Sequence, residues 1–132
     1  DFAYQCVARG SELLGSQGNR YYLGKNGKPH LDTGSFVTMI QGAVHRSATI
    51  LGKPSANYFL NAGAEFKLEP HEIAVIGDDL ESDIQGGQLA GMYTIQVQTG
   101  KGDPALTDHF TKIRPDMTLP SFGHLVSHFD LT

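Results

Sequence analysis

The chain has 132 residues, of which 39% are hydrophobic and 18% are charged, and its net charge is −4. This length is enough for one domain with a buried core. The mild acidity, without any run rich in lysine or arginine, argues against a nucleic-acid partner, and no apolar run approaches the roughly 20 residues that cross a bilayer. The single cysteine, Cys6, excludes an internal disulfide and favours a reducing compartment, so we expect a cytoplasmic protein.

Apolar spacing and turn residues predict helices and strands that alternate along most of the chain. Asn26–Gly27 predicts a hairpin within an irregular loop, Thr33 or Ser35 is the expected N-cap of the second helix, and Ser55 is that of the third. In chain order, the expected elements are a helix at 1–9, a strand at 12–14, a loop at 15–34, a helix at 35–45, a strand at 48–51, a helix at 56–66, a strand at 72–77, a helix at 82–92, strands at 93–98 and 108–113, and a helix at 121–129.

Strand–helix alternation with nearly continuous apolar strands is typical of a parallel sheet covered by helices. In such sheets, ligands bind at the carboxyl ends of the strands. Two charged features follow strands in this chain: Lys53 comes after the strand at 48–51, and the acidic stretch 78–83 comes after the strand at 72–77. We therefore expect both features to face one site.

The acidic stretch holds Asp78, Asp79, Glu81 and Asp83 within six residues. Carboxylates at the end of a strand suit Mg²⁺, which prefers oxygen ligands and needs only one or two carboxylates from the protein. A nearby lysine, such as Lys53, would balance charge on a phosphate oxygen. A magnesium ion, a lysine and an acid together indicate phosphoryl transfer.

Two stretches carry a family resemblance: ILGKPSANYF at 50–59 and VIGDDLESDIQGGQLAGMYTIQVQTGKG at 75–102. They resemble the carboxyl-terminal portion of haloacid dehalogenase (HAD) superfamily phosphatases, in the branch that includes NagD, the 4-nitrophenylphosphatases and pyridoxal phosphate phosphatase. The resemblance implies part of a Rossmann-like α/β core, with a parallel sheet and helices on both faces. It also implies that residues 1–46 are the end of an α/β cap domain and that residues 47–132 are the second half of the hydrolase core.

The resemblance implies a role for each residue that matches a family motif. Lys53 matches the catalytic lysine that stabilises an aspartyl-phosphate intermediate. Asp78 matches a direct Mg²⁺ ligand, Asp83 matches the acid that orders the metal's waters, and Asp79 is a further metal-site candidate through a bound water. In the cap segment, where the branch often reads TNxDxxY, Gln17 and Asn19 replace the usual Asn and Asp, whereas Tyr22 is retained.

By the same resemblance, the intact protein is expected to be a Mg²⁺-dependent phosphatase that acts on a small phosphate ester. The family's nucleophile is the first Asp of a DxD motif upstream of the cap, and no DxD tripeptide occurs here. The chain is thus expected to be inactive alone and to need an amino-terminal half, in the same or a separate polypeptide. Without the nucleophile's strand, the strand at 72–77 would have an unpaired edge. A homodimer through the cap is also in keeping with the family.

Other functions and sites remain as alternatives. A non-catalytic HAD-fold remnant or scaffold stays open, whereas a receiver-like signalling domain is disfavoured because its lysine would follow the acid pair. His124 and His128 have the spacing to share a metal, but a solvated face is favoured. The stretch TGKGD at 99–103 lacks phosphate-loop spacing and is expected to be a surface turn. Cys6 is expected in the core, and Arg20, Tyr21 and Tyr22 either touch substrate or pack on the surface.

Overall fold

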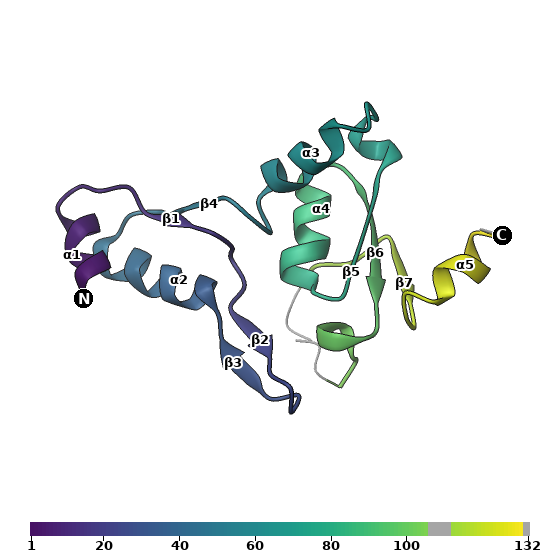
Figure 1. The fold of residues 1–132 in the computed structure, drawn as a ribbon, viewed down its shortest axis with the longest axis horizontal. Helices are drawn as coiled ribbons and strands as arrows, with labels where there is room; N and C mark the ends of the chain where they lie inside the picture. Colours follow the sequence, from purple (N-terminus) through teal and green to yellow (C-terminus); the bar gives the residue numbers. More distant parts are fainter. Residues whose placement is uncertain (106–111, 131–132) are drawn as a thin grey trace.

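The computed structural model describes residues 1–105 and 112–130. Figure 1 shows α1, α2 and a hairpin on one side, and a three-stranded sheet with α3, α4 and α5 on the other. The helices are α1 (Phe2–Ala8), α2 (Thr33–Val44), α3 (Ala56–Ala64), α4 (Gln85–Leu89) and α5 (His124–His128), with short helical turns η1 (Pro70–Glu72), η2 (Leu80–Ile84) and η3 (Gly100–Gly102). The strands are β1 (Leu14–Gly15), β2 (Tyr21–Leu23), β3 (Pro29–Leu31), β4 (Thr49–Ile50), β5 (Ala74–Gly77), β6 (Tyr93–Val97) and β7 (Met117–Leu119).

The predicted hairpin is confirmed, and the N-cap of the following helix is corrected. β2 and β3 pair antiparallel, and Gly27 in their connection has a φ of 72°, a left-handed conformation that glycine adopts without strain. Helix α2 is capped by Asp32, whose side chain accepts from the Thr33 amide, and not by Thr33 or Ser35. The helix begins earlier than expected because the aspartate places its carboxylate at the first amide.

The sheet β5–β6–β7 is parallel and has helices on both faces, as expected. Neighbouring side chains on a strand point to opposite faces. On β6, buried Thr94 lies against Gly87 of α4, whereas the next residue, Ile95, packs with Leu125 of α5. Helix α3 joins the α4 face through Phe59. This packing accounts for the helix-weakening glycines of α4, because a Cβ at Gly86 or Gly87 would press into Phe59 or the sheet.

Strand β4 departs from the expected single sheet. It pairs in parallel with β1 and, within the described residues, does not join the sheet of β5. This pairing links the segments before and after residue 46, where the resemblance implies a boundary between cap and core. That domain boundary stays a prediction. Most of the strand expected at 108–113 lies outside the described residues, and the third strand of the sheet is β7 instead. Among the described helices, none has the length and apolar character to span a membrane.

Two smaller expectations can be placed within this fold. The expected core position of Cys6 is only partly met, because Cys6 is half-buried and Val7 beside it is the buried residue of α1. Ser55 stands at the N-cap position of α3, as expected, but its side chain makes no capping hydrogen bond.

Asp116, the residue before β7, hydrogen-bonds Thr94 of β6, and removing this contact tests how the sheet is held together. Its Oδ2 accepts from the Thr94 amide at 2.8 Å and from the Thr94 hydroxyl at 2.6 Å, and Thr94 is 0% exposed. The Asp116→Ala substitution would leave both Thr94 donors buried without a partner. We expect it to lower the free energy of unfolding by about 1–3 kcal/mol, measured by thermal unfolding. Glu65→Ala, at the exposed end of α3, is the control and should change little.

The Asp116 contact should also depend on pH. The hydrogen bonds from the Thr94 side chain and amide hold the pKa of Asp116 below its usual value. The contact therefore stabilises the fold above the unfolded-state pKa of Asp116, and the stabilisation is lost as the pH falls through the lower, folded-state pKa. The stability difference between the parent chain and Asp116→Ala should accordingly be full at neutral pH and shrink in acid. An unchanged difference in acid would contradict this role.

Candidate functional site

The end of β5 is shaped by a turn that folds the acidic stretch back on itself. Strand β5 stops at Gly77, and Asp79 caps the π-helical turn η2 by accepting from the Glu81 amide at 3.0 Å and the Ser82 amide at 3.3 Å. The predicted helix at 82–92 thus begins earlier, at Leu80, and continues as α4. The turn carries Asp83 back to the strand, where its Oδ2 accepts from the Asp79 amide at 3.2 Å.

Lys53 and Asp83 meet beside this strand end. The Lys53 Nζ lies 2.6 Å from Asp83 Oδ1, although 30 residues separate them in the chain. The Asp83 side chain is 10% exposed and that of Lys53 is 37% exposed, so the cation can also reach a ligand. Burial lowers the pKa of Lys53, but its hydrogen bond and ion pair with Asp83 outweigh this effect and raise it. Lys53 is therefore cationic at neutral pH.

Lys101, which lies in a stretch expected to be a surface turn, is part of the same site. Its Nζ lies 2.6 Å from Asp79 Oδ2, and its backbone amide donates to Asp78 Oδ2 at 2.7 Å. The Asp79 and Lys101 side chains are only 15% and 13% exposed. Burial raises the pKa of Asp79, but the hydrogen bond and charge of Lys101 outweigh this effect and lower it. Gly100, with a φ of 56°, allows this close approach because a Cβ there would overlap Asp78.

The three candidate metal residues differ in the oxygens they have available. Both Asp79 oxygens and both Asp83 oxygens accept from protein donors. Asp78 Oδ2 accepts from the Lys101 amide, whereas Oδ1 has no donor within the described residues. No three acidic, histidine or cysteine side chains in the described ranges gather into a metal cluster. The available carboxylate oxygens therefore fit a metal ion that takes a single carboxylate ligand from this chain, and Mg²⁺ can be held in that way.

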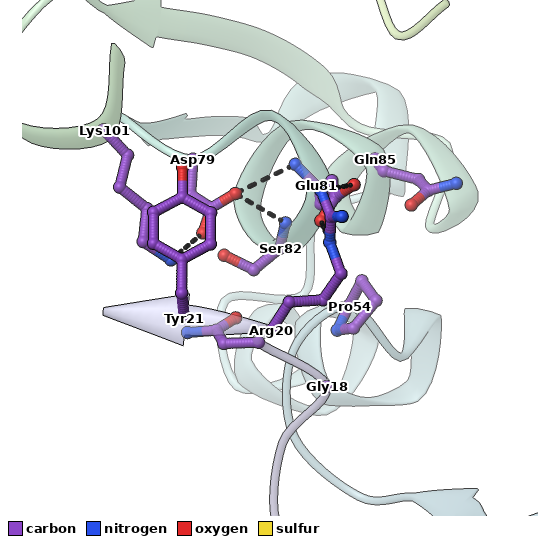
Figure 2. Close-up of a pocket in the computed structure, with 10 residues that line it drawn as sticks. Gly18, Arg20, Tyr21, Pro54, Asp79, Glu81, Ser82, Gln85 and Lys101 are labelled. Atoms are coloured by element: carbon purple, nitrogen blue, oxygen red, sulfur yellow. Dashed lines mark hydrogen bonds and ion pairs between the residues drawn. The ribbon is translucent and has the colours of Figure 1, made fainter. Parts of the chain in front are cut away.

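A cleft of about 180 Å³ opens beside these residues, between the loop before β2 and the turn η2. Arg20 bridges it with two hydrogen bonds of 2.7 Å to the Glu81 carboxylate. Figure 2 shows the Tyr21 ring beside Lys101, whose Nζ lies 4.5 Å from the ring centroid. Neither contact was predicted, because the partners are far apart in sequence and belong to separate elements.

The other candidate residues have local partners. Gln17 donates to Asp32 at 2.8 Å and accepts from the Asn19 amide, so it holds the loop against the start of α2. This hydrogen bond and that of the Thr33 amide lower the pKa of Asp32. Tyr22 stacks on His30 across the hairpin. His124 bonds Ser121, and His128 packs edge-on against Phe129, as suits an exposed helix face.

Comparison with known proteins gives the family. The HAD-hydrolase-like family model matches residues 50–125. The chain belongs to the HAD-hydrolase-like family. It is 39% identical over 126 residues to the haloacid dehalogenase-like hydrolase domain-containing protein 2 of Bos taurus, an alignment that covers 96% of this chain and 48% of that protein. The chain thus spans about half the length of this curated relative.

Solved HAD structures confirm the fold and the expected branch. The 4-nitrophenylphosphatase of Thermotoga maritima superimposes with a TM-score of 0.79 at 25% identity, covering 95% of this chain and 48% of that one. The glycerol phosphate phosphatase of Mycobacterium tuberculosis, in complex with magnesium, has the same fold, with a TM-score of 0.71 at 22% identity over 93% of this chain and 37% of that one. The predicted resemblance to NagD-like phosphatases is confirmed.

Gly77 tests how tightly the HAD site is packed. A Cβ at Gly77 would overlap the Asp83 carboxylate, whereas a Cβ at Gly42, within α2, would meet nothing within 4 Å. Gly77→Ala is expected to displace Asp83 from Lys53 and to cost about 1–3 kcal/mol of stability. Gly42→Ala should instead stabilise the exposed helix by up to about 1 kcal/mol. Thermal unfolding of both variants checks this pair, and equal shifts would contradict the packing argument.

Proposed function

We propose that this chain supplies the carboxyl-terminal half of a Mg²⁺-dependent phosphatase that hydrolyses a small phosphate ester. The observation that carries the proposal is the 2.6 Å ion pair of Lys53 and Asp83, which sits next to Asp78 at the end of β5. A cation can neutralise charge on a phosphate oxygen, and a carboxylate with an available oxygen can bind the metal ion that accompanies the phosphate. The family match and the structural similarity to the 4-nitrophenylphosphatase of Thermotoga maritima support the same reaction class.

In this proposal, Asp78 is the residue that would hold Mg²⁺, and the Lys101 amide fixes its carboxylate by donating to Oδ2. The ion would supply charge neutralisation at the phosphate oxygens. Lys53 balances charge on the transferred phosphoryl group, and Asp83 orients the Lys53 ammonium. Asp79 keeps the turn η2 in place and presents Lys101 to the site. The magnesium-bound relative of the same fold supports the choice of metal.

We place the nucleophile outside these 132 residues. An aspartate supplied by the remainder of the protein would attack phosphorus in line, forming the aspartyl-phosphate as the bond from phosphorus to the ester oxygen breaks. A second aspartate from the same part would give its proton to the departing alcohol and then take one from the water that hydrolyses the aspartyl-phosphate. Among the described strands, none pairs with the outer edge of β5, and this supports the proposal because an added strand there would complete the ladder. The proposal keeps residues 1–46 as the end of the cap and residues 47–132 as the second half of the core.

Two further properties belong to the proposal. The lone cysteine suits a reducing compartment, so we propose a cytoplasmic location. Exposed apolar side chains on α1 and α2, including Phe2, Phe36 and Met39, support a homodimer in which these helices take part.

A non-catalytic HAD-fold scaffold is the second candidate. The observation that favours it is that lysines or backbone amides already occupy both oxygens of Asp79 and of Asp83. Turnover of any phosphate ester through this site would exclude it.

Removal of the metal tests the proposed function. The protein to use is the full-length protein, meaning the polypeptide or assembly that contains this chain and the nucleophile. Its hydrolysis of 4-nitrophenyl phosphate should stop when divalent ions are chelated and return when Mg²⁺ is added in excess. Hydrolysis that resists chelation, or no hydrolysis with Mg²⁺ present, would overturn the proposal.

A further inference from the structure

Lys101 contacts two carboxylates of the candidate site through different atoms. Its backbone amide donates to Asp78 Oδ2 at 2.7 Å, and its side-chain Nζ lies 2.6 Å from Asp79 Oδ2. A donor that holds one oxygen of a metal-binding carboxylate orients the other oxygen. The position of the Lys101 backbone therefore sets how the Asp78 carboxylate is presented to a metal ion.

The backbone around this amide needs an anchor. The short turn η3 reads Gly–Lys–Gly, so Lys101 provides its one side chain beyond hydrogen. Glycine loses more conformational freedom on ordering than any other residue, and a turn flanked by two glycines is costly to fix in one geometry. The contacts of the Lys101 side chain therefore help to hold the amide in place.

Two groups hold the Lys101 side chain. One is the Asp79 carboxylate, and the other is the ring of Tyr21, whose centroid lies 4.5 Å from Nζ (Figure 2). The side chains of Lys101 and Asp79 are only 13% and 15% exposed. Attraction between a cation and an aromatic ring strengthens where water is excluded, and so does an ion pair. Tyr21 thus holds the ammonium directly and also shields its pair with Asp79.

The two neighbouring tyrosines of β2 have different contacts. Neighbouring side chains on a strand point to opposite faces. Tyr22 stacks on His30 across the hairpin, with ring centroids 5.3 Å apart, whereas Tyr21 lies against Lys101. The hairpin β2–β3 therefore uses one tyrosine for its own packing and directs the other toward the carboxylates that follow β5.

We infer that Tyr21 is a positioning residue of the proposed Mg²⁺ site: its ring holds the Lys101 side chain and, with it, the amide that orients the Asp78 carboxylate. The inference rests on the proposed phosphatase function and its metal. It makes the hairpin β2–β3 part of what sets the affinity for the ion, although Tyr21 itself is not a metal ligand.

Calorimetric titration of the full-length protein with Mg²⁺ tests this without any substrate. Tyr21→Leu keeps an apolar side chain but removes the ring, and it should raise the Kd for Mg²⁺ about fivefold. Tyr21→Phe keeps the ring, so its Kd should stay within about twofold of the parent value. Tyr22→Leu, on the same strand, is the matched control and should leave the Kd unchanged.

A second background separates positioning from general damage to the cleft. In Lys101→Met the ammonium is missing, so adding Tyr21→Leu should change the Kd by less than about twofold. Damage caused by loss of the ring would instead weaken Mg²⁺ binding in both backgrounds by the same factor.

Four results would overturn this inference alone: an unchanged Kd in Tyr21→Leu, an equal weakening in Tyr22→Leu, an equal weakening in the Lys101→Met background, or a Tyr21→Phe variant as weak as Tyr21→Leu. A parent protein that binds no Mg²⁺ would overturn the proposed function and this inference with it.

Discussion

Replacing Asp78 with asparagine is expected to lower kcat of the full-length protein by on the order of a thousandfold, since a metal ion contributes several kcal/mol to stabilising charge in the transition state. The side-chain amide oxygen of asparagine can still accept from the Lys101 amide, as Asp78 Oδ2 does at 2.7 Å. The substitution therefore changes the oxygen available to the metal and little else. The measurement is Mg²⁺-dependent hydrolysis of 4-nitrophenyl phosphate at saturating substrate.

Thermal unfolding provides the control for Asp78→Asn. The variant should melt close to the parent protein, because the fold contact of Oδ2 is kept. Glu65→Gln should retain both full activity and full stability, since Glu65 lies at the exposed end of α3. Unchanged turnover in Asp78→Asn would remove Asp78 from the metal site.

The Lys53→Met substitution is the second large effect. Loss of the ammonium removes the charge proposed to stabilise the transferred phosphoryl group, and kcat should fall about 10²–10³-fold. It also leaves Asp83, whose side chain is 10% exposed, without the cation now 2.6 Å away. We expect about 1–3 kcal/mol of lost stability, a value kept modest because Lys53 itself is 37% exposed.

A double variant separates the two roles of Lys53. In Lys53→Met/Asp83→Asn, the unpaired carboxylate becomes neutral, so part of the lost stability should return. Activity should not return, because the ammonium is still missing. Recovery of activity together with stability would mean that Lys53 serves only to hold the fold, and that the proposed catalytic role is wrong.

Local patterns made the strand and acid motif predictable from sequence. The apolar run before Gly77 predicted β5, and the proximity of Lys53 to the acidic stretch followed from the rule that ligand-binding side chains gather at the carboxyl ends of strands. The expectation that both features follow strands of one sheet was wrong, because β4 pairs with β1 and not with the sheet that carries Asp78. Loop geometry, which short motifs do not encode, brings Lys53 to the site.

Lys101 shows what the sequence could not supply. Its stretch failed the spacing of a phosphate loop, and nothing local indicates that Gly100 lets the backbone approach Asp78. The Arg20–Glu81 pair joins residues 61 positions apart, and only the folded chain brings them together. The observed N-cap, Asp32, lies directly before Thr33, one of the two predicted N-caps. Aspartate is a preferred N-cap residue, so the sequence did contain the information needed to predict it.

We propose that this chain holds half of a phosphatase centre, and one paired assay tests this. The most direct measurement compares the 132-residue chain and the full-length protein in one assay, Mg²⁺-dependent hydrolysis of 4-nitrophenyl phosphate, with the intact mass of each sample determined first. We expect turnover by the full-length protein and none by the chain alone. Turnover by the chain at the full-length rate, or a full-length protein that is inactive with Mg²⁺, would contradict it.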